Sequence, residues 1–198
     1  MARRTDTREA ILARATDLFG RWGVEAVSLD QIAHDVGVAK QTLLYWFASK
    51  DDLVENVLAA TAAELAVVVE AAIGAASDDP LDRIEAVVKA VFRPAVRRPA
   101  LLGLVREMSR LPAETSERVT VHLRPLAERA VNWMRTEMDR GRLRRADPEI
   151  VVALAYATVT GIATEPEALR VVGWPADTAG LRRLRSELVD FLRSALAP

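Results

Sequence analysis

Cysteine is absent from this sequence of 198 residues, which excludes disulfides, thiolate metal sites and a cysteine nucleophile. Aromatic residues make up only 5% of the chain, and no segment alternates polar and apolar residues convincingly, as a half-buried strand would. The remainder is 51% hydrophobic and 28% charged, and it is rich in alanine, leucine, valine, arginine and glutamate. This composition favours helices and predicts a soluble, all-α protein.

Long apolar runs are also lacking. The longest nearly uncharged stretch, residues 150–164, has 15 residues, whereas a helix that crosses a bilayer needs roughly 20. The first nine residues are mostly charged or polar and carry no apolar segment of an export signal. We therefore expect a cytoplasmic protein with no membrane partner, in which residues 150–164 form a buried helix.

The charge balance is close to neutral, with a formal net charge of −1. Residues 1–50 contain seven Lys or Arg and six Asp or Glu, so even this part has a net charge of only +1. Proteins that bind nucleic acids are usually basic over the binding region. Any affinity for DNA must therefore come from locally placed cations and from a second subunit.

Helical caps divide the first part of the chain. Thr7 is the expected N-cap of a helix over residues 8–22, which Gly23 ends. Ser49 is the expected N-cap of a longer helix that runs from residue 50 to about residue 72. From there to the end the pattern stays helical, and prolines and glycines separate the segments.

Between these two helices, the sequence predicts a pair of short helices joined by a tight turn. Ser28 and Gln31 form a capping box at the start of residues 29–36, Gly37 ends that helix, and the next covers residues 39–47. Such a pair is the helix-turn-helix unit, whose second helix enters the DNA major groove. The residues expected in the core of the three N-terminal helices are Ile11, Ala15, Leu18, Phe19, Trp22, Leu29, Ile32, Ala33, Val36, Ala39, Leu43 and Phe47.

The second short helix presents polar residues where base edges would lie. Lys40, Gln41 and Thr42 occupy its first turn, and these side chains can contact guanine, adenine and the thymine methyl group, respectively. The alternative for this face is an ordinary solvated surface, and Trp46 has the alternative of packing against the following helix. Residues expected to contact phosphates through a hydroxyl, an indole N–H or an amine are Ser28, Tyr45, Trp46 and Lys50.

A set of positions between residues 7 and 53 keeps the spacing of a known family: Leu18-Phe19 and Gly23, Ile32-Ala33 and Gly37-Val38, and Leu43, Phe47, Ser49-Lys50 and Leu53. This quarter of the chain resembles the DNA-binding domain of TetR-family regulators. One departure concerns the second short helix, where the family usually has a tyrosine and this chain has Leu44. Tyr45 is the candidate to replace that tyrosine.

The resemblance implies a division of the chain and a function. Residues 1–48 are expected to form a three-helix DNA-binding domain and residues 49–198 a larger helical domain for effector binding and dimerisation, with about nine helices in all. The implied function is a repressor that a small-molecule effector releases from a palindromic operator. The alternative is a DNA-binding adaptor whose C-terminal domain binds a protein partner and no ligand.

A homodimer through the last two long helices is expected, with ordinary packing inside one chain as the alternative. Apolar residues repeat along the final helix and small residues along the one before it, and small residues allow helices to approach closely. The final helix contributes Leu181, Leu184, Leu188, Phe191, Leu192 and Ala195. The preceding helix contributes Ala153, Ala157, Gly161 and Thr164.

The effector would require a mostly apolar pocket between helices. The candidate lining residues, each of which has plain core packing as the alternative, are Phe92, Met108, His122, Trp133, Met134 and Tyr156. No nucleophile with a base, no phosphate-binding glycine loop and no metal-ligand spacing around His34 or His122 is present in the sequence. We therefore expect no enzyme activity, no catalytic residues, no metal and no cofactor.

Overall fold

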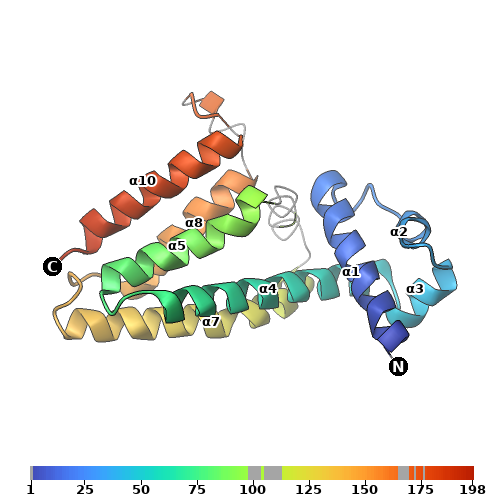
Figure 1. Ribbon diagram of the computed structural model, residues 1–198, viewed down its shortest axis with the longest axis horizontal. Helices are drawn as coiled ribbons and strands as arrows, with labels where there is room; N and C mark the ends of the chain where they lie inside the picture. Colours follow the sequence, from blue (N-terminus) through green and yellow to red (C-terminus); the bar gives the residue numbers. More distant parts are fainter. Residues whose placement is uncertain (1, 98–103, 105–112, 165–169, 172, 176) are drawn as a thin grey trace. The chain divides into compact units, whose positions relative to one another are not determined.

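The structure is a computed structural model that describes residues 2–97, 104, 113–164, 170–171, 173–175 and 177–198. Within these ranges every regular element is a helix, which confirms the all-α prediction (Figure 1). The described residues form eight helices, and the expected total of about nine stays a prediction. They are α1 (Ala2–Trp22), α2 (Leu29–Val36), α3 (Lys40–Trp46), α4 (Lys50–Ala75), α5 (Pro80–Arg97), α7 (Ala113–Asp139), α8 (Pro148–Thr164) and α10 (Thr178–Leu196).

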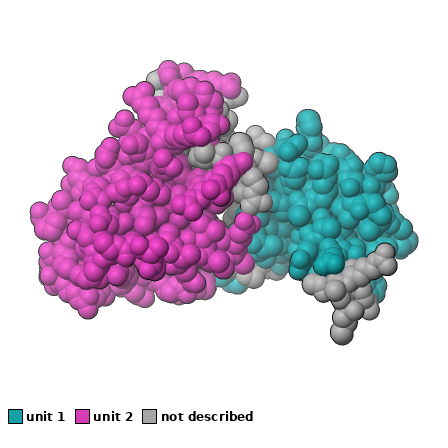
Figure 2. Space-filling view, viewed as in Figure 1, with its two compact units in different colours: residues 1–62, 99–122 teal, residues 63–98, 123–198 magenta. Residues whose placement is uncertain are grey.

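The chain divides into two compact units (Figure 2). Unit 1 comprises residues 1–62 and 99–122, and unit 2 comprises residues 63–98 and 123–198. Helix α4 therefore contributes its first half to unit 1 and its second half to unit 2. The expected functional boundary between residues 48 and 49 stays a prediction.

The core of unit 1 joins α1, α2 and α3 to the first turns of α4. Its fully buried side chains include Ile11, Phe19, Ile32, Leu43 and Phe47, all of which the helical periodicity placed in the core. Burial of one such side chain stabilises the fold by about 1.5–3 kcal/mol relative to leaving it exposed. The sequence pattern therefore identified most of this core correctly.

Two expected core residues are exposed instead. Trp22 is 66% exposed, because it lies in the last turn of α1, where the periodic face continues but the core does not. Ala39 is also exposed, since it is the extended N-cap of α3 and not its first inward-facing residue. Helical spacing identifies the face of a helix, and it leaves open how far along that face the neighbouring helices reach.

Helix α4 is the one helix in the described ranges that is long and apolar enough to cross a bilayer, on length and composition alone. Leu53, Val54, Val57 and Leu58 from its first turns are buried in the core of unit 1. Packing within unit 1 therefore accounts for the apolar residues of these first turns.

Helices α5 and α10 lie side by side in unit 2 (Figure 1). Near the end of α10, the guanidinium Nη1 of Arg193 lies 3.1 Å from Asp82 Oδ1 and 2.6 Å from Glu85 Oε2, in the first turns of α5. The two helices are therefore antiparallel. Leu181, Leu188 and Leu192, expected in a dimer seam, are buried within this single chain, which supports the packing alternative for these positions.

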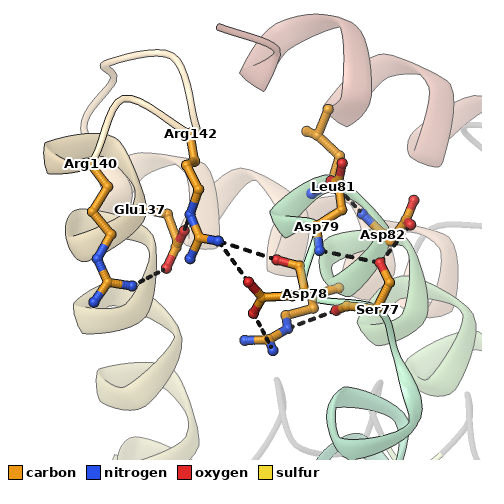
Figure 3. Close-up of polar contacts among 9 residues, drawn as sticks. Ser77, Asp78, Asp79, Leu81, Asp82, Glu137, Arg140 and Arg142 are labelled. Atoms are coloured by element: carbon orange, nitrogen blue, oxygen red, sulfur yellow. Dashed lines mark hydrogen bonds and ion pairs between the residues drawn. The ribbon is translucent and has the colours of Figure 1, made fainter.

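Arg142 connects a buried carboxylate near the end of α7 to the turn between α4 and α5 (Figure 3). Glu137, 2% exposed, forms ion pairs with Arg142 at 2.6 Å and with Arg140 at 3.2 Å. Arg142 also donates a 3.0 Å hydrogen bond to Asp78, which pairs with Arg83 as well. The hydrogen bond from Arg142 lowers the pKa of Asp78 below its usual range. A buried carboxylate requires such partners, since an unpaired one would be strongly destabilising.

The last turn of α10 is bonded to the same loop. The backbone N–H of Arg144 donates to the carbonyl of Leu196 at 2.9 Å, and its Nε donates to the carbonyl of Ala195 at 2.5 Å. The final carbonyls of a helix have no partner within the helix, so these two bonds cap it from outside.

Candidate nucleic-acid interface

Local signals fix the helix-turn-helix geometry. The Ser28 hydroxyl accepts a hydrogen bond from the N–H of Gln31, as predicted for the N-cap of α2. Gly37 follows α2 with φ of 79°, a left-handed conformation that side chains with a Cβ rarely adopt. Two bonds close the turn, from the Gly37 N–H to the His34 carbonyl and from the Val38 N–H to the Ala33 carbonyl. These caps set the angle at which α3 leaves α2.

The inner face of α3 holds it against the core, because Leu43 and Phe47 are fully buried. On the outer face Gln41 is exposed and Tyr45 is 66% exposed, while Thr42 is half-buried. This arrangement leaves the first turn of α3 and its next outward position accessible, as a helix that reads base edges requires.

Lys40 has a partner that the sequence analysis did not anticipate. Its Nζ lies 2.7 Å from Oδ2 of Asp30, in the first turn of α2. Both side chains are largely exposed, so the pair contributes at most about 1 kcal/mol to stability. The ammonium nevertheless has a carboxylate beside it in the free protein. Asp30 is thus a residue of this surface that sequence reasoning missed, because contact across ten residues depends on the angle between two helices.

Trp46 and Leu44 are less accessible than the exposed residues of α3. Trp46 is half-buried and packs against the core of unit 1, and its ring meets Tyr45 edge-on with centroids 5.3 Å apart. Leu44 is also half-buried. Tyr45 is therefore the more accessible of the two aromatic candidates for DNA contact.

The two remaining candidate phosphate contacts flank α3. Ser28 is exposed, and its hydroxyl keeps a hydrogen to donate while its oxygen caps α2. Lys50, at the start of α4, has its Nζ 3.4 Å from the carbonyl oxygen of Glu25. This weak contact leaves the ammonium able to reach another acceptor.

An ion-paired cluster supports the same unit behind α2. Arg14 of α1 lies 2.6 Å from Asp35 and 3.1 Å from Asp17. The hydrogen bond from Arg14 holds the pKa of the Asp35 carboxyl below its usual range. On the other side of the unit, Arg8 donates to Asn56 at 2.8 Å and lies over the Phe47 ring. These contacts fix the helices and leave the outer face of α3 uncovered.

The structure does not gather the effector-pocket candidates into one described cavity. Phe92 and Met134 are buried core residues, Trp133 is half-buried, and Tyr156 is 58% exposed. Met108 and the side chain of His122 lie outside the described residues. Across the described ranges, no three His, Asp or Glu side chains are placed to hold a metal ion. The pocket therefore stays a prediction.

Comparison with known proteins identifies the N-terminal unit. Residues 11–57 match the family model described as bacterial regulatory proteins, tetR family. The HTH-type transcriptional regulator RutR of Escherichia coli K12 is 45% identical over 51 residues, which are 26% of this chain and 24% of RutR. This chain therefore matches only about a quarter of the length of this curated relative.

Solved structures extend the likeness of fold to the whole chain. A TetR transcriptional regulator from Chloroflexus aurantiacus J-10-FL has a TM-score of 0.79 at 22% identity, over 100% of this chain and 99% of that one. A protein from Saccharomonospora viridis, described as a transcriptional regulator in complex with choline, has a TM-score of 0.81 at 18% identity, over 98% and 99%. The N-terminal residues 11–57 therefore match the tetR family of bacterial regulatory proteins, and the chain as a whole shares the fold of these solved structures.

Proposed function

We propose that this protein is a homodimeric transcriptional repressor that binds a palindromic DNA operator and is released from it by a small-molecule effector. The DNA-binding part of the proposal rests on one observation: α3 has one face buried in the core and the opposite face exposed. Leu43 and Phe47 anchor it in the core, while Gln41 and Tyr45 are exposed on its outer face. A helix held in this way can enter the major groove without disturbing the fold.

The contacts divide into two groups. Lys40, Gln41 and Thr42 read base edges from the first turn of α3. Tyr45 and the flanking residues position the helix on the phosphates. Of the flanking residues, Ser28 and Lys50 are the stronger candidates, and Trp46 contributes mainly by packing.

Exposed apolar residues on α8 and α10 support the dimer. Ile150 and Leu154 are 57% and 56% exposed and lie one helical turn apart on α8, and Phe191 of α10 is 61% exposed. Ala153, Ala157 and Gly161 on α8 are exposed as well. Apolar side chains grouped in this way are typical of a surface that a second subunit covers.

The effector part of the proposal rests on the family and on the fold shared with the choline-bound protein from Saccharomonospora viridis. The effector would bind in unit 2 and change the separation of the two DNA-binding units of the dimer. Linkage then requires operator DNA to weaken effector binding by the same factor by which effector weakens DNA binding.

Selection from random duplex DNA tests the central claim. The purified protein should enrich a palindrome whose half-sites are about 34–36 Å apart, one helical turn of DNA. Gln41→Ala should then lower affinity for that sequence by roughly 5- to 150-fold for each half-site, and by the product of the two factors for the dimer, because each half-site loses a bidentate base contact of about 1–3 kcal/mol. The matched control is Ser194→Ala, an exposed polar residue of α10 that should bind like the wild type. Failure to enrich any sequence would contradict the proposal.

The dimer surface needs its own test. Leu154→Glu places a charge in the exposed apolar group on α8 and should give a monomer in sedimentation equilibrium. Val67→Glu is the matched control, because Val67 is 66% exposed on α4, outside that surface. A Leu154→Glu variant that remains dimeric would exclude α8 as the interface.

A further inference from the structure

The described residues that line a cleft in unit 2 are all cations. It has a volume of about 330 Å³ and lies between α5 and α10. The residues that line it are Lys89, Arg93, Arg97, Arg182 and Arg185.

The two helices build this cleft from simple repeats. On α5, Lys89, Arg93 and Arg97 follow each other at four-residue intervals, so they share one face of the helix. Arg182 and Arg185 stand three residues apart near the start of α10. Since the helices are antiparallel, the last turns of α5 lie opposite the first turns of α10. The cationic side chains of α5 therefore lie across the cleft from the two arginines of α10.

The described carboxylates that pair across the two helices lie at the other end of the helix pair. Asp82 and Glu85 pair with Arg193, and Glu85 also lies 2.5 Å from Lys89. The other four cleft cations differ: within the described part of the chain, their guanidiniums form no hydrogen bond or ion pair.

Most other arginines of unit 2 with described side chains form an ion pair with a carboxylate. Arg83 pairs with Asp78, Arg135 with Glu149, and Arg129 with Glu70. Four guanidiniums that have no carboxylate partner among the described residues repel each other in this cleft, and clustered charges of one sign attract ions of the opposite sign. A bound anion would relieve that repulsion.

Guanidinium chemistry indicates which anion fits. Its planar fork of donors pairs with two oxygens of a phosphate at once. Each phosphate monoester carries a charge of about −1.5 to −2 near pH 7, so two phosphates match four uncompensated cations. The volume is at the small end of the range of ligand pockets, which favours a small molecule.

We propose that the cleft between α5 and α10 binds a small molecule that carries two phosphate groups. None of its residues belongs to α3 or to the candidate effector pocket. This binding does not depend on the proposed repressor function, because it can be measured on the protein without DNA.

Calorimetric titration of the full chain with inorganic pyrophosphate tests the proposal at fixed ionic strength. We expect saturable binding with one pyrophosphate per chain, and weaker binding of orthophosphate and sulfate. The double variant Arg93→Gln/Arg182→Gln should bind at least about tenfold more weakly, because it loses charge-assisted hydrogen bonds from both helices. Circular dichroism and thermal melting confirm that each variant is folded.

The matched control is Arg124→Gln/Arg145→Gln, which removes the same charge from two exposed arginines of unit 2 outside the cleft. It should bind pyrophosphate within about twofold of the wild type. Absence of saturable binding, or an equal loss in both double variants, would overturn the proposal. Displacement of pyrophosphate by duplex DNA, dependent on Arg93 and Arg182, would overturn it too, since the cleft would then be a nucleic-acid surface.

Discussion

The carboxylate of Asp30 should weaken the attraction between the Lys40 ammonium and DNA. In the free protein its Oδ2 lies 2.7 Å from Lys40 Nζ, and the two side chains are 66% and 47% exposed, respectively. Asp30→Asn removes this charge with little change of shape. Because an exposed ion pair contributes at most about 1 kcal/mol, the variant should fold normally.

The effect on DNA binding follows from counting charges. Freed from Asp30, each Lys40 ammonium brings one more unpaired positive charge into the groove, where it neutralises the charge of about one phosphate even when it contacts a base edge, which makes two per dimer. Each additional phosphate contact steepens the slope of log K against log salt by about 0.9, so the dimer should show a change of about 1.8. Over a fourfold rise in salt, this adds roughly a tenfold loss of affinity. Binding to unrelated DNA at low salt should become tighter.

Fluorescence anisotropy with the selected operator and with a scrambled duplex, from 50 to 200 mM salt, measures both quantities. Asp139→Asn is the matched control, because it makes the same change of charge at an exposed residue of α7 in unit 2. An unchanged or shallower slope for Asp30→Asn would refute the argument that the pair with Asp30 restrains Lys40.

Three further predictions concern stability. Leu43→Ala should lower the free energy of unfolding by about 2–5 kcal/mol in urea titration, because the side chain is fully buried; a loss below about 1 kcal/mol would contradict that packing. Gly180→Ala should lower the melting temperature, since a Cβ there would lie 1.8 Å from the Pro175 carbonyl oxygen, and an unchanged temperature would show that the backbone adjusts freely. The pKa values of Asp35 and Asp78 are lowered by folding, so both carboxylates stabilise the protein above about pH 4, and this stabilisation is lost as pH falls through the folded-state pKa. The variant Asp35→Asn/Asp78→Asn should therefore lose less melting temperature than the wild type between pH 5 and pH 2.5, and an equal loss would contradict this assignment.

Features set by neighbouring residues could be predicted from the sequence. Ser28 and Gly37 delimit α2 as Leu29–Val36, because an N-cap and a left-handed glycine act within one helical turn. The same holds for Ser49, whose hydroxyl accepts from the N–H of Asp52 at the start of α4. The inward positions Leu43 and Phe47 followed from periodicity alone.

Features that depend on the angle between helices could not be predicted. The pairing of Lys40 with Asp30 joins two helices across a turn, and it changes the expected role of a candidate base-reading residue. The cation-lined cleft brings Arg93 and Arg182 together from helices far apart in the sequence. Composition shows many arginines, but the contact between α5 and α10 decides which of them line the cleft without a described carboxylate partner.

The hydrogen bonds from Arg144 to the last turn of α10 should limit local unfolding in unit 2. Helix ends normally fray, and their amides exchange quickly with solvent. Here the loop after α7 holds the Leu196 and Ala195 carbonyls, while Arg142 two residues earlier holds Asp78 before α5. Three segments distant in sequence must therefore separate together, so the loop amide of Arg144 should exchange as slowly as amides within the helices it joins.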